Sequence, residues 1–132
     1  MTTETPKTAR ILLVDDDADI LFVARLALKR GGYQVTVAEG GDAALELLDD
    51  AAPFDLIICD RMMPQMSGLE TLEALRKRPV HARTPFMFLT AKALQNERDE
   101  GLLMGACRYL TKPFEPRELV AEVTRVLAEL PR

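Results

Sequence analysis

The sequence contains too little cysteine and histidine to build the metal sites that depend on them. Among 132 residues there are two cysteines, Cys59 and Cys107, and one histidine, His81. Neither cysteine belongs to a metal-type cluster, and a single histidine cannot form such a cluster alone. We therefore expect both cysteines to lie in strands as reduced thiols, which fits a reducing cytosol, and His81 to be a solvated loop residue.

Long apolar runs and an excess of basic residues are also absent. No stretch is long enough to span a bilayer, and the first residues lack the apolar segment of a signal peptide. The net charge of −4 disfavours general binding to nucleic acid or to membranes. The short basic group at residues 76–78 more simply closes a helix, where it meets the negative end of the helix dipole. We expect a cytoplasmic protein with no direct nucleic-acid or membrane contact.

Hydrophobic residues still make up 48% of the sequence, enough for one domain with a core. We assign this domain to residues 9–130 and expect residues 1–8 to form a flexible tail. Strand and helix patterns alternate along the domain, which predicts an α/β fold, a doubly wound (βα)5 unit around a central parallel sheet. The predicted strands cover residues 10–14, 33–38, 56–59, 86–89 and 107–110, and a fourth helix is expected near residues 94–104.

Several residues mark the ends of the predicted helices. Asp17 can cap the first helix, and the pair Gly31-Gly32 can end it. Ser67 and Glu70 have the spacing of a capping box ahead of the third helix.

Polar side chains follow four of the predicted strands. Asp15 and Asp16 come directly after the first strand and Asp60 after the third, while Thr90 and Lys112 follow the last two apolar runs. In a parallel sheet these groups share the carboxyl edge, where open α/β folds bind ligands. Carboxylates from two loops suit Mg²⁺, and an amine suits a phosphate oxygen. Taken singly, each has an ordinary alternative: a helix cap, a β-branched strand residue or a solvent-exposed lysine.

With these motifs in place, the chain resembles a response-regulator receiver domain, the phosphoacceptor module of two-component signalling. The resemblance covers roughly residues 9–130 and implies a flavodoxin-like, five-stranded parallel sheet in the order 2-1-3-4-5. The matching motifs occur in the family's order and spacing: Val14-Asp15-Asp16; Asp60 followed by Met63-Pro64 and Gly68; Thr90-Ala91; and Gly105-Ala106, Tyr109 and Lys112-Pro113-Phe114.

The resemblance implies a phosphoacceptor and a metal site. Asp60 would be the residue that is phosphorylated. Asp16 and Asp60 would bind Mg²⁺ directly, together with the backbone carbonyl of Met62, and Asp15 would act on the metal through water. Such carboxylates would repel one another without a cation.

The resemblance also implies how a signal would be received and passed on. Thr90 and Lys112 would contact phosphoryl oxygens, and a histidine kinase or a histidine phosphotransfer protein would be the phosphodonor. Thr90 would then move and let Tyr109 swing inward, which would change the surface formed by the fourth helix, the last strand and the last helix. The alternative for Tyr109 is a half-buried tyrosine on an edge strand with no role in signalling.

Two other functions fit parts of the sequence. A small Mg²⁺-dependent phosphatase of the haloacid-dehalogenase type would use an Asp-x-Asp, which residues 15–17 contain, but it offers no reason for Tyr109 or for the motif after Asp60. A phosphate-independent interaction module would not need an intact site. We expect a monomer or weak dimer with a protein target that the sequence does not identify. The end at Arg132 favours a stand-alone receiver, with an excised domain as the alternative.

Overall fold

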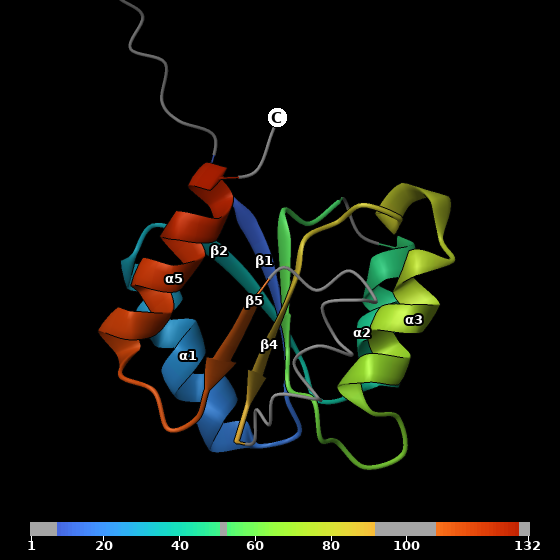
Figure 1. The fold of residues 1–132 in the computed structure, drawn as a ribbon, viewed down its shortest axis with the longest axis horizontal. Coiled ribbons are helices and arrows are strands. Elements are labelled where there is room, and N and C mark those ends of the chain that lie inside the picture. Colours follow the sequence, from blue (N-terminus) through green and yellow to red (C-terminus); the bar gives the residue numbers. More distant parts are fainter. Residues whose placement is uncertain (1–7, 51–52, 92–107, 130–132) are drawn as a thin grey trace, which may run out of the picture.

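The computed structural model describes residues 8–50, 53–91 and 108–129. Within these ranges strands and helices alternate, as the sequence pattern predicts (Figure 1). The fourth predicted helix, residues 94–104, and Cys107 lie outside the described residues. The elements are β1 Arg10–Val14, α1 Ala18–Arg30, β2 Gln34–Ala38, α2 Gly41–Asp50, β3 Leu56–Cys59, α3 Gly68–Arg76, the 3₁₀ helix η1 Pro79–His81, β4 Phe86–Thr90, β5 Arg108–Thr111 and α5 Pro116–Glu129.

The strands form one parallel sheet in the order β2-β1-β3-β4-β5, which confirms the predicted fold class and strand order. The chain leaves β1 for β2 on one side and returns to β3 on the other. The strand order therefore reverses at β1, and the loops after β1 and β3 diverge from adjacent strand ends. Such a switch point is where doubly wound folds bind ligands.

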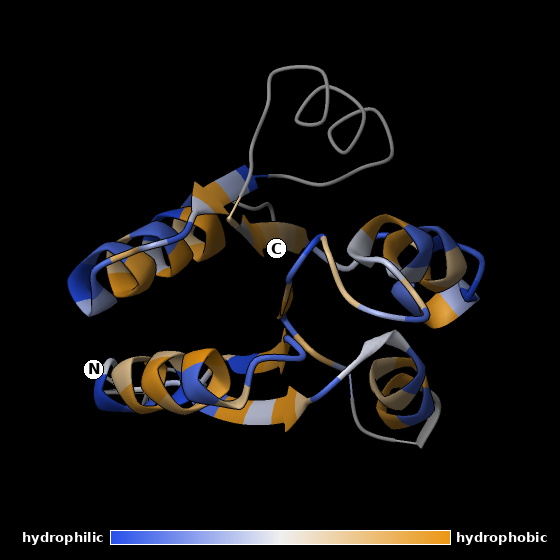
Figure 2. Cartoon of the chain, turned by 90° about the horizontal axis from the view of Figure 1, so that it is seen from below, coloured by the Kyte–Doolittle hydropathy of each residue, from blue (hydrophilic) through white to orange (hydrophobic). Residues whose placement is uncertain are grey.

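Helices cover both faces of the sheet. Figure 1 shows α1 and α5 on one face and α2 and α3 on the other. Successive residues of β1 point to opposite faces, so Leu12 and Val14 pack on the α2 and α3 side while Ile11 and Leu13 pack on the other. Burial on both faces explains why the central strands are apolar throughout, as the orange strands of Figure 2 illustrate.

The helix ends confirm the boundary signals. The Asp17 side chain accepts hydrogen bonds from the backbone N–H groups of Asp19 and Ile20, and Gly31 ends α1. Ser67 and Glu70 form the predicted capping box at the start of α3. Because α1 and α3 begin beside the carboxyl edge of the sheet, these caps fix the chain on either side of the predicted site.

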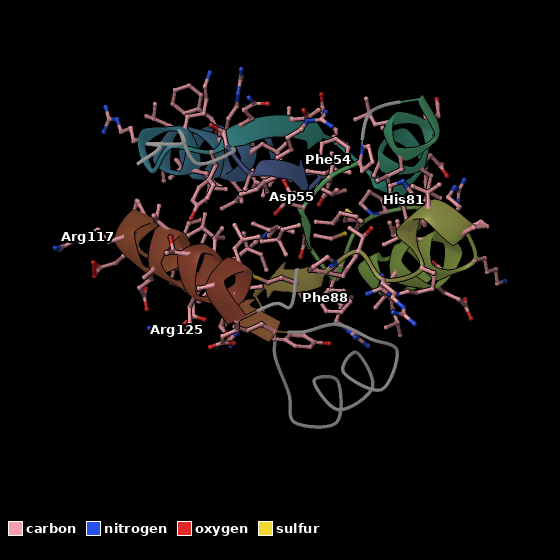
Figure 3. All side chains as sticks on the ribbon, turned by 90° about the horizontal axis from the view of Figure 1, so that it is seen from above. Phe54, Asp55, His81, Phe88, Arg117 and Arg125 are labelled. Carbon is pink, nitrogen blue, oxygen red and sulfur yellow. The ribbon has the colours of Figure 1, made fainter. Side chains whose placement is uncertain are left out.

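The interpretation of His81 as a solvated residue is wrong. Its side chain is buried between the end of α2 and the turn before β4, on the α2 and α3 side of the sheet (Figure 3). Nε2 lies 3.1 Å from the carbonyl oxygen of Leu48, and Nδ1 lies 3.2 Å from Thr84 Oγ1. Both ring nitrogens thus have a partner, and this satisfies the polar ring in place of water.

The basic group at the end of α3 binds backbone carbonyls, as expected. Arg76 donates to the carbonyl oxygens of His81 and Thr84, and Arg78 donates to that of Ala74 at 3.1 Å. These contacts satisfy acceptors at a helix end and in the following turn. Among the residues that the structure describes, no helix is both long and apolar enough to cross a membrane.

Candidate functional site

Three carboxylates meet at the carboxyl edge of the sheet. Asp15, Asp16 and Asp60 each offer an oxygen atom, and these atoms all lie within 4.8 Å of one another. Asp15 and Asp60 are buried and Asp16 is exposed. The structure therefore brings together the acidic residues that the sequence places in separate loops, with one of them facing solvent.

The register of the sheet explains this meeting. Val14 and Cys59 are partners at the ends of β1 and β3, so Asp15 and Asp60 are the next residue on each strand. The backbone N–H of Asp60 donates to the carbonyl oxygen of Val14 at 2.9 Å, which continues the ladder into the site. The Asp15 side chain in turn accepts from the backbone N–H of Asp17 at 2.9 Å.

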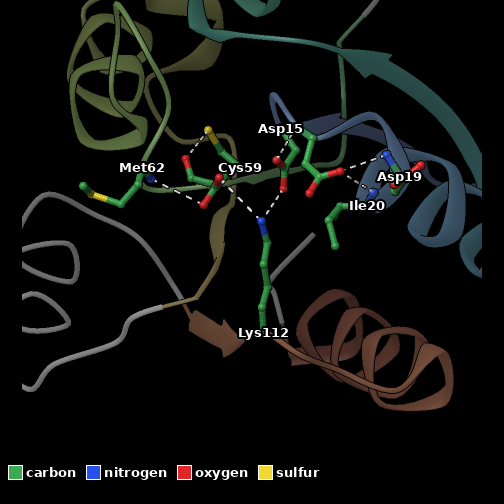
Figure 4. Close-up of polar contacts among 8 residues, drawn as sticks. Asp15, Asp19, Ile20, Cys59, Met62 and Lys112 are labelled. Atoms are coloured by element: carbon green, nitrogen blue, oxygen red, sulfur yellow. Dashed lines mark hydrogen bonds and ion pairs between the residues drawn. The ribbon is translucent and has the colours of Figure 1, made fainter.

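Lys112 brings a positive charge to the same place from the loop after β5. Its Nζ lies 2.7 Å from Asp15 Oδ2 and 3.5 Å from Asp60 Oδ2 (Figure 4). The Lys112–Pro113 peptide bond is cis. The interpretation of Lys112 as a solvent-exposed lysine is wrong, because the ammonium is largely buried between two carboxylates.

Burial and neighbouring charges both shift the pKa values of Asp60 and Lys112. Burial raises the pKa of Asp60, the Asp15 charge raises it further, and the Lys112 ammonium offsets only part of this rise. Burial lowers the pKa of Lys112, but its hydrogen bond to Asp15 and the charges of Asp15 and Asp60 outweigh burial, so its pKa is raised. The lysine is therefore held in its charged form, and a further positive charge would favour the charged form of Asp60.

Cys59 is buried next to this site, as predicted. Its thiol donates to the carbonyl oxygen of Asp60 at 3.2 Å. Burial raises the pKa of the Cys59 thiol well above its usual range, and the charges of Asp60 and Asp15 add to the rise. Cys59 therefore stays a neutral packing residue.

The loop after Asp60 is packed tightly against the start of α3. The backbone N–H of Gly68 donates to the carbonyl oxygen of Arg61 at 2.8 Å. A Cβ atom at Gly68 would lie 2.2 Å from the carbonyl oxygen of Asp60, so only glycine fits at this position. Met62 donates its backbone N–H to Asp60 Oδ1 at 3.4 Å, and the residue as a whole is 66% exposed.

The donor set of the site fits Mg²⁺. Carboxylate oxygens are the protein ligands that Mg²⁺ prefers, and the three here lie close enough to share one ion. Burial and, after it, the Asp15 charge raise the pKa of Asp60 despite Lys112, so a bound cation would favour the charged carboxylate. The role of the Met62 carbonyl and the water-mediated role of Asp15 remain predictions.

Thr90 lies on β4, the strand beside β3, and Tyr109 lies on β5, the next strand of the sheet. Thr90 ends β4 in register with Thr111, but its side chain lies outside the part of the chain that the structure describes. Tyr109 is half-buried, and its ring centroid lies 4.9 Å from that of Phe88. Its hydroxyl accepts a hydrogen bond from Arg61 at 3.2 Å.

Sequence reasoning missed Arg61 as a residue of this region. The signal that could have found it is its place directly after Asp60, combined with a strand order that sets β4 and β5 beside β3. A buried arginine is unusual unless it is paired. Here its side chain reaches the tyrosine two strands away.

Comparisons with known proteins agree with this geometry. The family model described as "Response regulator receiver domain" matches residues 11–124. The chain is 45% identical over 118 residues to the transcriptional regulatory protein CpxR of Escherichia coli K12, covering 89% of this chain and 49% of CpxR. It is 41% identical over 117 residues to the phosphate regulon transcriptional regulatory protein PhoB of Pseudomonas aeruginosa, covering 89% of this chain and 51% of PhoB. The chain thus spans about half the length of these curated relatives.

A solved structure gives the same answer. The chemotaxis protein CheY4 of Vibrio cholerae superposes with a TM-score of 0.87 at 36% identity, over 91% of this chain and 99% of that one. The match to a receiver model over most of the chain favours the receiver over the phosphatase interpretation. The chain belongs to the response-regulator receiver domain family of two-component signalling.

Proposed function

We propose that this domain is a signalling switch that accepts a phosphoryl group on Asp60. The observation that carries the proposal is the place of the Asp60 carboxylate, which lies beside two further carboxylates and 3.5 Å from the Lys112 ammonium. A carboxylate in such a setting can act as a nucleophile once its negative charge is balanced. We assign the switch role to residues 9–130.

The transfer forms one bond and breaks one. A carboxylate oxygen of Asp60 attacks the phosphorus of a phosphohistidine, the P–N bond breaks, and its electron pair stays on the departing imidazole nitrogen. The product is an acyl phosphate on Asp60. Lys112 already lies at this carboxylate, and its ammonium stabilises the charge on the phosphoryl oxygens during transfer.

Asp15, Asp16 and Asp60, with the backbone carbonyl of Met62, would hold Mg²⁺. When bound, Mg²⁺ neutralises the carboxylates and the phosphoryl oxygens. Asp15 keeps Lys112 in place through their 2.7 Å contact and shapes the site through its own charge. Water later hydrolyses the acyl phosphate at the same site, so the domain promotes its own phosphorylation and dephosphorylation and does not turn over a separate substrate.

The readout is assigned to Thr90 and Tyr109. Phosphorylation adds almost two negative charges and strong acceptor oxygens beside the end of β4. Thr90 would donate its hydroxyl to one of these oxygens, and Tyr109 would change its orientation on β5. The equilibrium between two pre-existing conformations would then shift at the surface of the fourth helix, β5 and α5.

The partners follow from the same chemistry. A histidine kinase or a histidine phosphotransfer protein supplies the phosphoryl group, and a further protein, still to be identified, reads the changed surface. We place these events in the cytoplasm. The curated relatives are called transcriptional regulatory proteins, but this chain matches about half of each. Its net charge of −4 supports a domain that does not itself contact nucleic acid.

The charges on β5 and α5 bear on the oligomeric state. Arg108 pairs with Glu122 at 3.1 Å and with Glu129 at 2.9 Å, and Arg125 also pairs with Glu122. Because these charges are matched within one chain, they do not need a second copy. This supports a monomer or weak dimer.

Reduction of the acyl phosphate tests the phosphorylation site. The protein is treated with acetyl phosphate and Mg²⁺, and borohydride then converts an aspartyl phosphate to homoserine. Peptide mass spectrometry should find homoserine at position 60. Homoserine at position 15 or 16 would contradict the assignment of Asp60.

A further inference from the structure

Arg61, Phe88 and Tyr109 form a series of contacts that runs from the loop after β3 across β4 to β5. The guanidinium of Arg61 lies 5.9 Å from the centroid of the Phe88 ring, and the Phe88 and Tyr109 rings lie 4.9 Å apart at 33°. An Arg61 Nη atom donates to the Tyr109 hydroxyl at 3.2 Å, across 48 residues of sequence. The side chain that follows the proposed phosphoacceptor therefore ends on the tyrosine of β5.

The sheet register explains why these residues meet. Cys59, Phe88 and Tyr109 form one row across β3, β4 and β5. All three pack on the α2 and α3 side of the sheet. Arg61 lies in the loop two residues after Cys59, and its contacts with Phe88 and Tyr109 place its side chain on the same side.

Arg61 is held firmly at its backbone end. Its carbonyl oxygen accepts from the Gly68 N–H at 2.8 Å, and its Cα packs against Gly68 with no room for a side chain there. Arg61 as a whole is only 8% exposed. A buried guanidinium needs its hydrogen bonds, so a Tyr109 hydroxyl that leaves this contact removes a partner from a buried charge.

We propose that Arg61 is a positioning residue for Tyr109 and holds the tyrosine hydroxyl in the orientation that the structure shows. This inference rests on the proposed function in one respect, namely that Tyr109 leaves this orientation when Asp60 is phosphorylated. The contact then links the loop of the phosphoacceptor to β5 directly, in addition to the route through Thr90. It also opposes activation, because Tyr109 has to leave it.

Two consequences can be measured. Loss of the contact should change the surroundings of the Tyr109 ring in the unphosphorylated protein. By linkage, the factor by which this loss shifts the equilibrium toward the phosphorylated conformation should also appear in the affinity for a phosphoryl mimic. One hydrogen bond of this kind corresponds to roughly a two- to tenfold change in the ratio of the two conformations.

The sequence makes Tyr109 easy to observe, because the chain has only two tyrosines, Tyr33 and Tyr109. The protein is labelled with 3-fluorotyrosine, and the two ¹⁹F resonances are assigned with Tyr33→Phe. Arg61→Met keeps an unbranched side chain over Phe88 but cannot donate a hydrogen bond. Arg78→Met is the matched control, since it removes the same charge at the end of α3. Beryllofluoride with Mg²⁺ serves as the phosphoryl mimic.

In Arg61→Met without the mimic, the Tyr109 resonance should shift while that of Tyr33 stays in place, and Arg78→Met should leave both unchanged. A Tyr109 resonance that matches wild type in folded Arg61→Met would overturn the proposal. If wild type failed to bind the mimic, the proposed function would be contradicted, and the resonance without the mimic would still decide the role of Arg61.

A double-mutant cycle tests the coupling to the site. Arg61→Met and Tyr109→Phe should each tighten binding of the mimic two- to tenfold, and the double variant should gain no more than either single variant. Fully additive effects, or an affinity unchanged in Arg61→Met, would mean that Arg61 does not act through Tyr109. Tyr109→Phe tests the same contact from its other side should Arg61→Met fold poorly.

Discussion

The Lys112 ammonium lies 2.7 Å from an Asp15 carboxylate oxygen, although 97 residues separate the two in the sequence. The loops after β1 and β5 supply this pair, and Asp60 lies within reach of the same ammonium. Without a bound cation, the Lys112 ammonium offsets part of the negative charge of the two buried carboxylates. The first prediction follows from this arrangement.

Lys112→Met should destabilise the protein in the absence of Mg²⁺. The variant leaves two buried carboxylates without their cation, and breaking a buried pair in this way costs about 3 kcal/mol. Urea unfolding measures the change, with the exposed Lys29→Met as the control for loss of a lysine. Adding Mg²⁺ should recover part of the lost stability. An unchanged free energy of unfolding would show that Lys112 does not balance the cluster.

Asp60→Asn should stabilise the metal-free protein at neutral pH. The folded-state pKa of Asp60 is raised above 3.8, so the folded protein holds this proton more tightly than the unfolded chain does. Its contribution to the free energy of unfolding therefore falls as the pH rises from about 4 through the folded-state pKa. The gain in Asp60→Asn should be about 1 kcal/mol or less after solvent screening, and should vanish at lower pH.

Urea unfolding between pH 3.5 and 7.5 measures this dependence, with Glu46→Gln on the exposed face of α2 as the control for loss of a carboxylate. A stability difference that is the same at every pH would contradict the raised pKa. Saturating Mg²⁺ should remove or reverse the difference, because only wild type keeps all three carboxylates.

Gly68→Ala should weaken both stability and phosphorylation. The new methyl group would lie 2.2 Å from the Asp60 carbonyl oxygen and 2.8 Å from Arg61 Cα, so the backbone of the phosphoacceptor must move. Overpacking of this kind costs about 1–3 kcal/mol. Thermal unfolding and the rate of labelling by acetyl phosphate measure the two effects. Gly40→Ala, where a Cβ meets nothing within 4 Å, is the control, and equal behaviour of the two variants would refute the steric argument.

His81→Ala should destabilise the fold and leave phosphorylation intact. It leaves the Leu48 carbonyl oxygen and the Thr84 hydroxyl without their ring partner, at a cost of about 2–3 kcal/mol including lost packing. Chemical unfolding and the labelling rate of the folded variant are compared with those of Val80→Ala, since Val80 is 71% exposed. A lower labelling rate in His81→Ala under conditions where the variant is fully folded would show that His81 contributes to the site.

The fold and the acidic site could be predicted from the sequence because both depend on local patterns. Each apolar run predicts a strand, and a parallel sheet brings the residue after each run to one edge. Asp15 and Asp60 therefore meet whatever the details of the helices. Asp17 and Ser67 fix where the neighbouring helices begin, so these positions too can be predicted from a few residues.

The contacts that the sequence did not predict depend on where distant segments pack. His81 looks like a loop residue until the end of α2 is placed over it, at Leu48. Arg61 looks like a surface cation until the strand order sets β5 near β3, which brings Tyr109 within 3.2 Å. Each is a polar residue with a partner more than 30 residues away, and hydropathy patterns carry no information about such pairs.

The mass of the intact protein after incubation with acetyl phosphate tests the central claim most directly. Wild type and Asp60→Asn are compared, each with Mg²⁺ and with an excess of chelator. The account predicts an added phosphoryl group in wild type that requires Mg²⁺ and is absent from Asp60→Asn. An adduct of equal yield in Asp60→Asn, or none in wild type under conditions that label another receiver domain, would contradict it.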